Sequence, residues 1–317
     1  MFLTEIKKHA VPSFTPFKKH SVPNKFGLIT NAFDDALLRR LKTLSPPSIS
    51  LSWLSKAVDF LAFSHSEARS LISNLEVTAL DDSLATYLDD SVKLLDICNS
   101  VSAEIERLRQ RRIVLAFAVH LLRDGKLLRA RETLTEWEGR RASGFGKADN
   151  AEVLVRDLAL GLGSTPRGKI SSVGRVVRRT MYAVRLVTVF VAGAVVSAMN
   201  GSAETVTVRT PAEFSWAESL NELESAVSGE LKRLFGKEAK RKGTLLEEVD
   251  DVATRVAEAC EIAEEDTERR NDVVKEVEGA MGSFSDGLEG LSKRVNEMFH
   301  GVLSNRNYML DHVRVRA

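Results

Sequence analysis

The sequence predicts an all-α protein, an elongated antiparallel bundle of long helices around one very apolar central helix. Apolar residues recur at every third or fourth position through most of the 317 residues, which is the period of a helix with one buried face. In the C-terminal third this recurrence becomes a heptad pattern, which is typical of long helices packed at shallow angles. Only seven prolines, three tyrosines and three tryptophans occur, and this composition disfavours an all-β protein.

Bulk composition is that of a folded protein. The chain is 44% hydrophobic and 28% charged, and it is long enough to bury a sizeable core. The formal net charge of +1 gives no electrostatic reason to expect a nucleic acid as partner. Cys98 and Cys260 both lie in apolar helical patterns, which fits buried thiols in a reducing compartment better than a disulfide.

We expect one helical-bundle domain over residues 26–317, with a connector rich in Gly, Pro, Ser and Arg near residues 161–180. A basic flexible arm over residues 1–25 precedes it and carries five lysines against one glutamate. The arm lacks the long apolar core of a secretory signal. A plastid transit peptide is the alternative, although such peptides are typically rich in arginine and serine.

Three helices are expected before the connector. The first starts at Phe26 and ends before the Ser-Pro-Pro-Ser stretch at 45–48. The second covers residues 51–76, and the third is long and covers residues 81–122. Asp81 and Asp82 suit the positive N-terminal end of that third helix.

Two heptad series are expected near the C-terminus. A capping box of Thr244 and Glu247 opens the first series. The first series is Leu245, Val249, Val252, Val256, Ala259 and Ala263, and the second is Val273, Val277, Ala280, Phe284, Leu288, Leu291, Val295, Met298 and Val302. We expect this stripe to pack within the molecule, with self-association as the alternative. Four glycines predict a kink or a break in its middle: Gly279, Gly282, Gly287 and Gly290.

A basic and then apolar segment follows the connector. No acidic residue occurs between Asp157 and Glu204, and the stretch from Leu186 to Met199 contains no charge. As a helix this stretch would be about 21 Å long, which is short of the roughly 30 Å hydrocarbon core of a bilayer. Its notable residues are Arg178, Arg179, Arg185, Leu186, Val189, Phe190, Val191 and Val195.

Three interpretations of this segment are open. A central helix that the rest of the bundle buries would explain the all-round apolar character. A short or re-entrant membrane span would use Arg185 as a snorkelling residue and Gly193 with Ser197 as a contact face. In a peripheral contact, the arginines would meet an anionic membrane surface.

The search for chemical sites predicts no catalytic, cofactor-binding or metal-binding residue. Residues 163–170, GSTPRGKI, approach the phosphate-binding pattern G-x-x-x-x-G-K-[ST], but Ile170 replaces the required hydroxyl. The six histidines show no metal-binding spacing, and we interpret His65 and His120 as half-buried helix residues. We interpret acid pairs such as Asp89–Asp90 as solvated helix faces.

One regulatory site is a hypothesis. Arg-Arg-Ala-Ser at 140–143 has a basic-basic-x-Ser form that many kinases favour. A phosphate on Ser143 would add roughly 1.5 to 2 negative charges beside the two arginines and reorder the loop or create a binding site for an adaptor.

Four blocks of this sequence resemble successive blocks of the plant BYPASS family and its exocyst-interacting ROH-type relatives. The blocks are LSWLSKAVDFLAFSHSEARSLI, YLDDSVKLLDICNSVSAEIERL, MYAVRLVTVFVAGAVVSAM and FSWAESLNELESAV. The resemblance covers most of the chain from Phe26 to Leu303 and implies a helical plant protein that is not an enzyme. It implies a regulator of growth and development, similar to proteins that restrain a root-derived mobile signal arresting shoot growth. The partners that it implies are exocyst components or signalling adaptors, and no functional residue transfers with it.

Overall fold

The structure is a computed structural model that describes residues 25–45, 47, 49–75, 82–142, 149–163, 172–236, 247–262 and 266–314. All regular structure in these ranges is helical, which confirms the predicted fold class. The elements are α1 (Lys25–Leu41), the 3-10 turn η1 (Lys42–Leu44), α2 (Leu51–Asn74), α3 (Asp82–Arg123), α4 (Leu127–Ala142), α5 (Asp149–Leu160), α6 (Val173–Asn200), α7 (Ala217–Phe235), α8 (Glu247–Glu261) and α9 (Thr267–Arg314).

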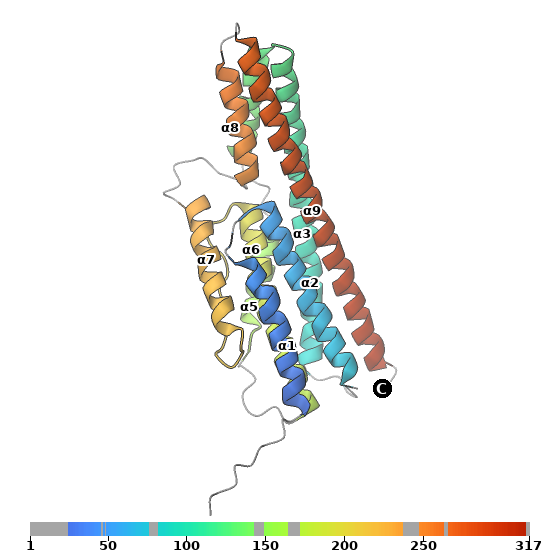
Figure 1. The fold of residues 1–317 in the computed structure, drawn as a ribbon. Coiled ribbons are helices and arrows are strands. Elements are labelled where there is room, and N and C mark those ends of the chain that lie inside the picture. The colour runs from blue at the N-terminus through green and yellow to red at the C-terminus, as the bar shows by residue number, and fades with distance from the viewer. Residues whose placement is uncertain are drawn as a thin grey trace, which may run out of the picture.

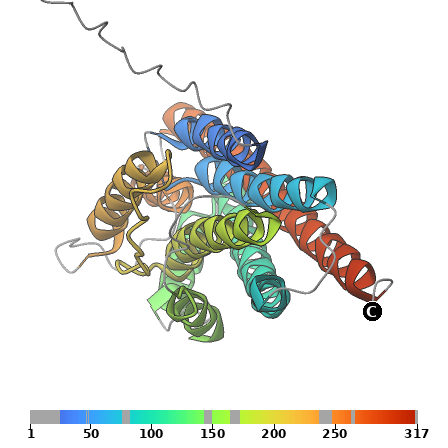
Figure 2. The same ribbon diagram turned by 90° about the horizontal axis from the view of Figure 1, so that it is seen from below.

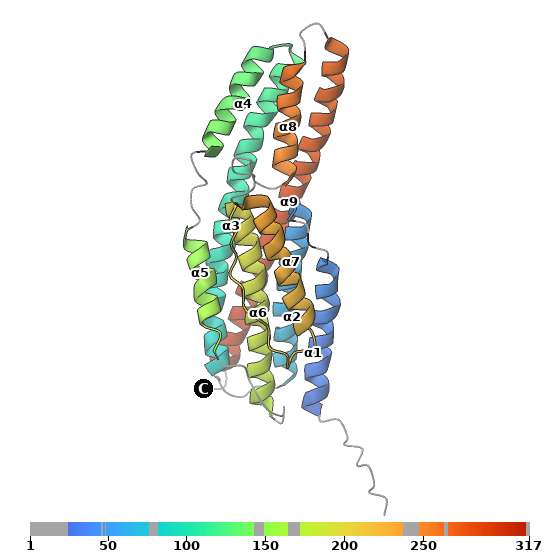
Figure 3. The ribbon, with the colours of Figure 1, turned by 90° about the vertical axis from the view of Figure 1, so that its left-hand side faces the viewer.

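Two antiparallel helices, α3 and α9, run the length of an elongated bundle (Figure 1). At the upper end α4 and α8 pack against them, and at the lower end α1, α2, α5, α6 and α7 join them (Figures 1 and 3). A hydrogen bond joins the two ends, since the Glu248 carboxylate on α8 accepts from the Leu51 N–H at the start of α2 at 2.8 Å. More helices pack side by side at the lower end, which therefore has the larger cross-section.

Helix α6 lies among α1, α2, α3, α5 and α7, as the view from below shows (Figure 2). Every residue from Leu186 to Met199 is buried. In the described part of the chain α6 is the helix that is long and apolar enough to cross a membrane, and 89% of its apolar window is buried inside the protein. Helix α6 begins at Val173, so residues 173–180 are helical and do not belong to the connector that the sequence predicted.

A non-helical segment, residues 201–216, runs back along α6. Gly201 ends the helix with a φ of 63°, a conformation that favours glycine. The Ser197 hydroxyl donates to the Glu204 carbonyl at 2.8 Å, and a Cβ on Gly193 would lie 3.0 Å from the Thr205 hydroxyl. In the structure the small face of Gly193 and Ser197 is therefore covered by the protein's own chain.

The same segment is fastened to α7 on its other side. The Glu224 carboxylate accepts from the Val208 N–H at 2.9 Å, and Asn221 bonds to both the N–H and the C=O of Thr210. Burial raises the pKa of Glu224 to about 7, against the opposing effect of the Val208 hydrogen bond. Residues 201–216 are thus held as a strap between α6 and α7.

Helix α9 carries a heptad stripe, as the sequence predicts. Its buried positions are Arg270, Val274, Val277, Met281, Phe284, Leu288, Leu291, Val295, Met298, Val302, Asn305 and Met309. Two predicted members are shifted by one residue, because Val274 and Met281 take the buried positions assigned to Val273 and Ala280. The predicted break at the glycines is wrong, since α9 is one continuous helix from 267 to 314.

Several predicted features lie outside the described residues. These are the phosphorylation candidate Ser143, residues 164–170 of the phosphate-loop-like stretch, and Thr244 of the capping box. Residues 1–24 of the basic arm lie outside them too. The segment before that stretch is helix α5.

Candidate functional site

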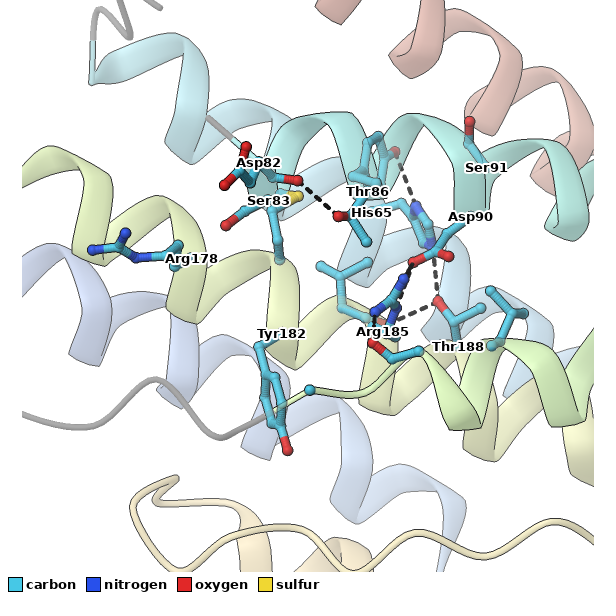
Figure 4. Close-up of a pocket in the computed structure, with 16 residues that line it drawn as sticks. His65, Asp82, Ser83, Thr86, Asp90, Ser91, Arg178, Tyr182, Arg185 and Thr188 are labelled. Carbon is cyan, nitrogen blue, oxygen red and sulfur yellow. Dashed lines mark hydrogen bonds and ion pairs between the residues drawn. The ribbon is translucent and has the colours of Figure 1, made fainter. Parts of the chain in front are cut away.

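A pocket of about 270 Å³ opens at the lower end of the bundle. Its walls come from the first turns of α3, the end of α5 with Gly161 and Gly163, and the first half of α6, while His65 of α2 forms part of its floor. We call it the α3–α5–α6 pocket. Figure 4 shows Arg178 and Asp82 toward one end of the pocket and a hydrogen-bonded group around Asp90 and Thr188 toward the other.

His65 is fixed through both ring nitrogens. Its Nδ1 lies 3.1 Å from the Tyr87 hydroxyl and its Nε2 lies 3.1 Å from the Thr188 hydroxyl (Figure 4). Because Thr188 donates its own proton to the Val184 carbonyl at 2.8 Å, it must accept from Nε2–H, and Tyr87 therefore donates to Nδ1. Burial lowers the pKa of His65 to about 4 and raises that of Tyr87 to about 12, so both groups are neutral.

This polar chain extends to α9. The Asn305 side chain donates to the His65 carbonyl at 3.3 Å and hydrogen-bonds Tyr87, and Arg69 donates to Asn305 at 3.2 Å. Arg306 donates to the Leu88 carbonyl and to the Ser91 hydroxyl. Side chains of α2, α3, α6 and α9 thus form one bonded polar layer inside an otherwise apolar bundle, and such a layer fixes which helices are neighbours.

Arg185 joins three helices at the wall of the pocket. Its guanidinium pairs with Asp90 of α3 and donates to the Gly161 carbonyl just past α5. A Cβ at position 161 would lie 3.1 Å from Arg185 Nη1, so a glycine leaves room for this contact. In the structure Arg185 is paired inside the protein rather than exposed as a snorkelling residue, and Asp90 is not on a solvated face as predicted.

Arg179 forms a second buried ion pair on the opposite side of α6. It donates to Asp34 of α1 at 2.6 Å and to the Glu213 carbonyl at 3.0 Å. Trp216 donates to the other Asp34 oxygen at 3.1 Å, and the Arg179 guanidinium lies 4.1 Å from the centre of the Phe214 ring. This cluster fastens α1 and the end of the strap to α6, in agreement with the rule that buried charges are paired.

The residues that the sequence singled out therefore separate into three groups. Leu186, Val189, Phe190, Val191 and Val195 lie in the core, at 5% exposure or less. Arg179 and Arg185 form internal ion pairs. Arg178 is exposed and lines the pocket.

Sequence reasoning missed the residues that form the pocket's polar floor. His65 was expected to be half-buried but is 4% exposed, whereas His120 is exposed. The signal available in the sequence was that each of three apolar stripes contains a polar residue: His65 on α2, Tyr87 on α3 and Thr188 on α6. Only their meeting in space shows that they satisfy one another.

The arrangement is suited to binding and to structural stability. The neutral His65 uses both nitrogens in structural bonds, and burial raises the pKa of the Cys98 thiol to about 12, which makes it a poor nucleophile. Among the described residues no group of three or more His, Cys, Asp or Glu side chains is placed to hold a metal ion.

The chain matches the model of a protein family described as "Protein ROH1-like" over residues 7–139 and 148–313. It is 28% identical to "Protein BPS1, chloroplastic" of Arabidopsis thaliana over 96% of this chain and 90% of that protein. It is 34% identical to "UPF0496 protein 4" of Oryza sativa subsp. japonica, over 82% of this chain but 60% of that longer protein. It is 23% identical to "Protein ROH1D" of Arabidopsis thaliana over 84% of this chain. No solved structure matches the chain.

Proposed function

The chain belongs to the ROH1-like family, and from this premise we propose that it is a non-enzymatic regulator of plant growth and development that acts by binding other proteins. The observation that carries the proposal is the similarity to the BPS1 protein over nearly the whole of both chains. The saturated bonding of His65 and the inert Cys98 thiol support a binding role over a catalytic one. The proposed partners are exocyst components or signalling adaptors.

The upper half of α3 offers a surface for such a partner. Ile113 and Phe117 are 62% and 53% exposed and lie four residues apart, which places them on one face of the helix. Large apolar side chains on an exposed helix face are typical anchors in protein interfaces. We therefore place the partner contact on this face.

Double substitution of Ile113 and Phe117 to Asp tests the proposal in plants that lack the protein. The variant is expected to keep its helical circular dichroism, to reduce co-purification with exocyst subunits by about tenfold or more, and to fail to restore normal shoot growth. Leu28→Asp, at a 55% exposed position on α1, is the matched control and is expected to retain both properties.

Restored growth by the double variant would exclude the α3 face as the functional contact. Failure of the wild-type protein to restore growth would exclude the developmental role itself.

A second candidate function is that of a membrane-anchored protein in vesicle trafficking or stress signalling. The observation that favours it is the length and apolar character of α6. The burial of that helix among five others supports the first proposal instead, because insertion would require the lower half of the bundle to open. Extraction of membranes with alkaline carbonate distinguishes the two.

We propose that the protein acts in the cytoplasm or at a cytoplasm-facing membrane, with the plastid as the alternative. The word "chloroplastic" in the printed name of the BPS1 relative supports the alternative. A fluorescent protein fused to the C-terminus of the full chain decides between them. Signal inside plastids that is lost when residues 1–24 are removed would establish the plastid.

A further inference from the structure

We propose that the α3–α5–α6 pocket binds a small organic acid that has an apolar body, one negative charge and a hydroxyl or amino group. The site lies at the lower end of the bundle and is separate from the α3 face proposed to bind a partner (Figures 1 and 4). Binding of an acid in this pocket is therefore independent of the protein contact on α3.

The size and walls of the pocket fit an apolar body of metabolite size. Its volume of about 270 Å³ is just below the roughly 300–1,000 Å³ of pockets for drug-sized ligands. Leu158, Met181 and Val184 line it, and each is 6% exposed or less. A molecule between these side chains gains affinity by burying its own apolar surface.

The interior of the pocket offers an acceptor, one oxygen of the Asp90 carboxylate. His65, Tyr87 and Thr188 form their hydrogen bonds with one another, with the Asn305 side chain and with the backbone. Both bonds from Arg185 to Asp90 go to a single oxygen, Oδ2, and within the described ranges no bond reaches Oδ1. A half-buried carboxylate oxygen favours a donor, so a hydroxyl or amino group of the ligand fits there.

The mouth of the pocket provides the charge that recognises an acid. Arg178 is exposed there and forms no ion pair with any residue that the structure describes, whereas Arg185 is neutralised by Asp90. A guanidinium recognises a carboxylate through two parallel hydrogen bonds. Asp82 also lines the pocket toward that end (Figure 4) and repels a second negative charge, which favours a monocarboxylate over a phosphate ester.

The test uses the full-length protein and a panel of hydroxy- and amino-substituted aromatic and aliphatic monocarboxylic acids, with the methyl ester and the unsubstituted acid of each. Binding is measured by ligand-observed NMR and isothermal titration. At least one acid is expected to bind, its ester and its unsubstituted analogue more weakly by about tenfold or more, because each lacks one charge-assisted hydrogen bond.

Two variants place the binding in this pocket. Arg178→Gln is expected to weaken the acid about tenfold or more, with Arg175→Gln on the same helix as the control outside the pocket lining. Thr86→Trp is expected to block the pocket, because Thr86 lines it and bonds only within its own helix. Thr135→Trp is the matched control, since Thr135 makes the same bond to its own helix on α4.

No binding from any acid in the panel overturns the proposal. Equal binding of acids and esters, or binding that survives both Arg178→Gln and Thr86→Trp in folded protein, also overturns it. Melting temperatures of all four variants establish that each is folded.

Discussion

At the scale of single residues, the polar side chains that interrupt the apolar stripes determine which helices are neighbours. His65, Tyr87, Thr188 and Asn305 come from four helices and satisfy one another in the core. A misplaced helix would leave several of these groups buried without partners, at a cost of about 1–3 kcal/mol each. These side chains therefore specify the arrangement of the helices as well as stabilising it.

The buried His65 makes stability depend on pH. Its pKa is about 4 in the folded protein and 6.5 when exposed, so between these values the unfolded chain binds more protons. The contribution of the neutral His65 to the free energy of unfolding is complete above pH 6.5 and is lost as the pH falls toward 4. Lowering the pH from 7 to 5 is expected to cost about 2 kcal/mol through this residue.

Urea unfolding of the wild type and of His65→Gln at pH 7 and pH 5 measures this effect. Glutamine still accepts from Tyr87 and donates to Thr188 but does not titrate in this range. The free energy of unfolding of the variant relative to that of the wild type is expected to be about 2 kcal/mol higher at pH 5 than at pH 7. An unchanged difference would mean that His65 is protonated in the folded state.

At the scale of elements, the glycines of α9 have unequal roles. A Cβ added to Gly279 or Gly282 meets no atom within 4 Å, whereas a Cβ on Gly287 would lie 2.9 Å from Leu51 Cδ1 and 3.0 Å from Leu51 Cβ. Leu51 is fully buried, so the rest of the core packs around it. Gly287 is thus where α9 passes close to the start of α2, and the helix continues through it because tertiary packing outweighs a weak local propensity.

Three alanine substitutions distinguish these roles by urea unfolding. Gly279→Ala and Gly282→Ala are each expected to raise the free energy of unfolding by about 0.5–1 kcal/mol, because alanine favours the helix. Gly287→Ala is expected to lower it, because overpacking costs about 1–3 kcal/mol and exceeds the gain in propensity. Equal stabilisation by all three would contradict the close contact with Leu51.

At the scale of the whole molecule, the burial of α6 leads to a prediction about how the protein relates to membranes. Its apolar surface is covered by α1, α2, α3, α5 and α7, and its outer small face by the strap. Exposing it to lipid would break the ion pairs of Arg179 and Arg185. We therefore expect alkaline carbonate to release the protein from plant membranes.

Val189→Asp with Val191→Asp tests this expectation in the same extraction. Each change places a carboxylate in the core, and the double variant is expected to misfold or be degraded. Val92→Asp with Val153→Asp makes the same change at positions 43% and 48% exposed and is expected to behave as the wild type. If the wild type stays in the pellet and the core variant is folded and soluble, α6 is a membrane anchor.

The sequence by itself determined the helical class, the long helices and the heptad stripe of α9. These follow from the local periodicity of apolar residues, whose side chains must be buried away from water. It also revealed the stretch from Leu186 to Met199, which contains no charge and is apolar all round. Only the tertiary structure decided that Arg185 meets Asp90, that Arg179 meets Asp34, and that His65 lies between Tyr87 and Thr188. These partners lie 22 to 145 residues apart in the chain, and no local pattern encodes such distances. The pocket depends on them too, because its walls come from the first turns of α3, the end of α5 and the first half of α6.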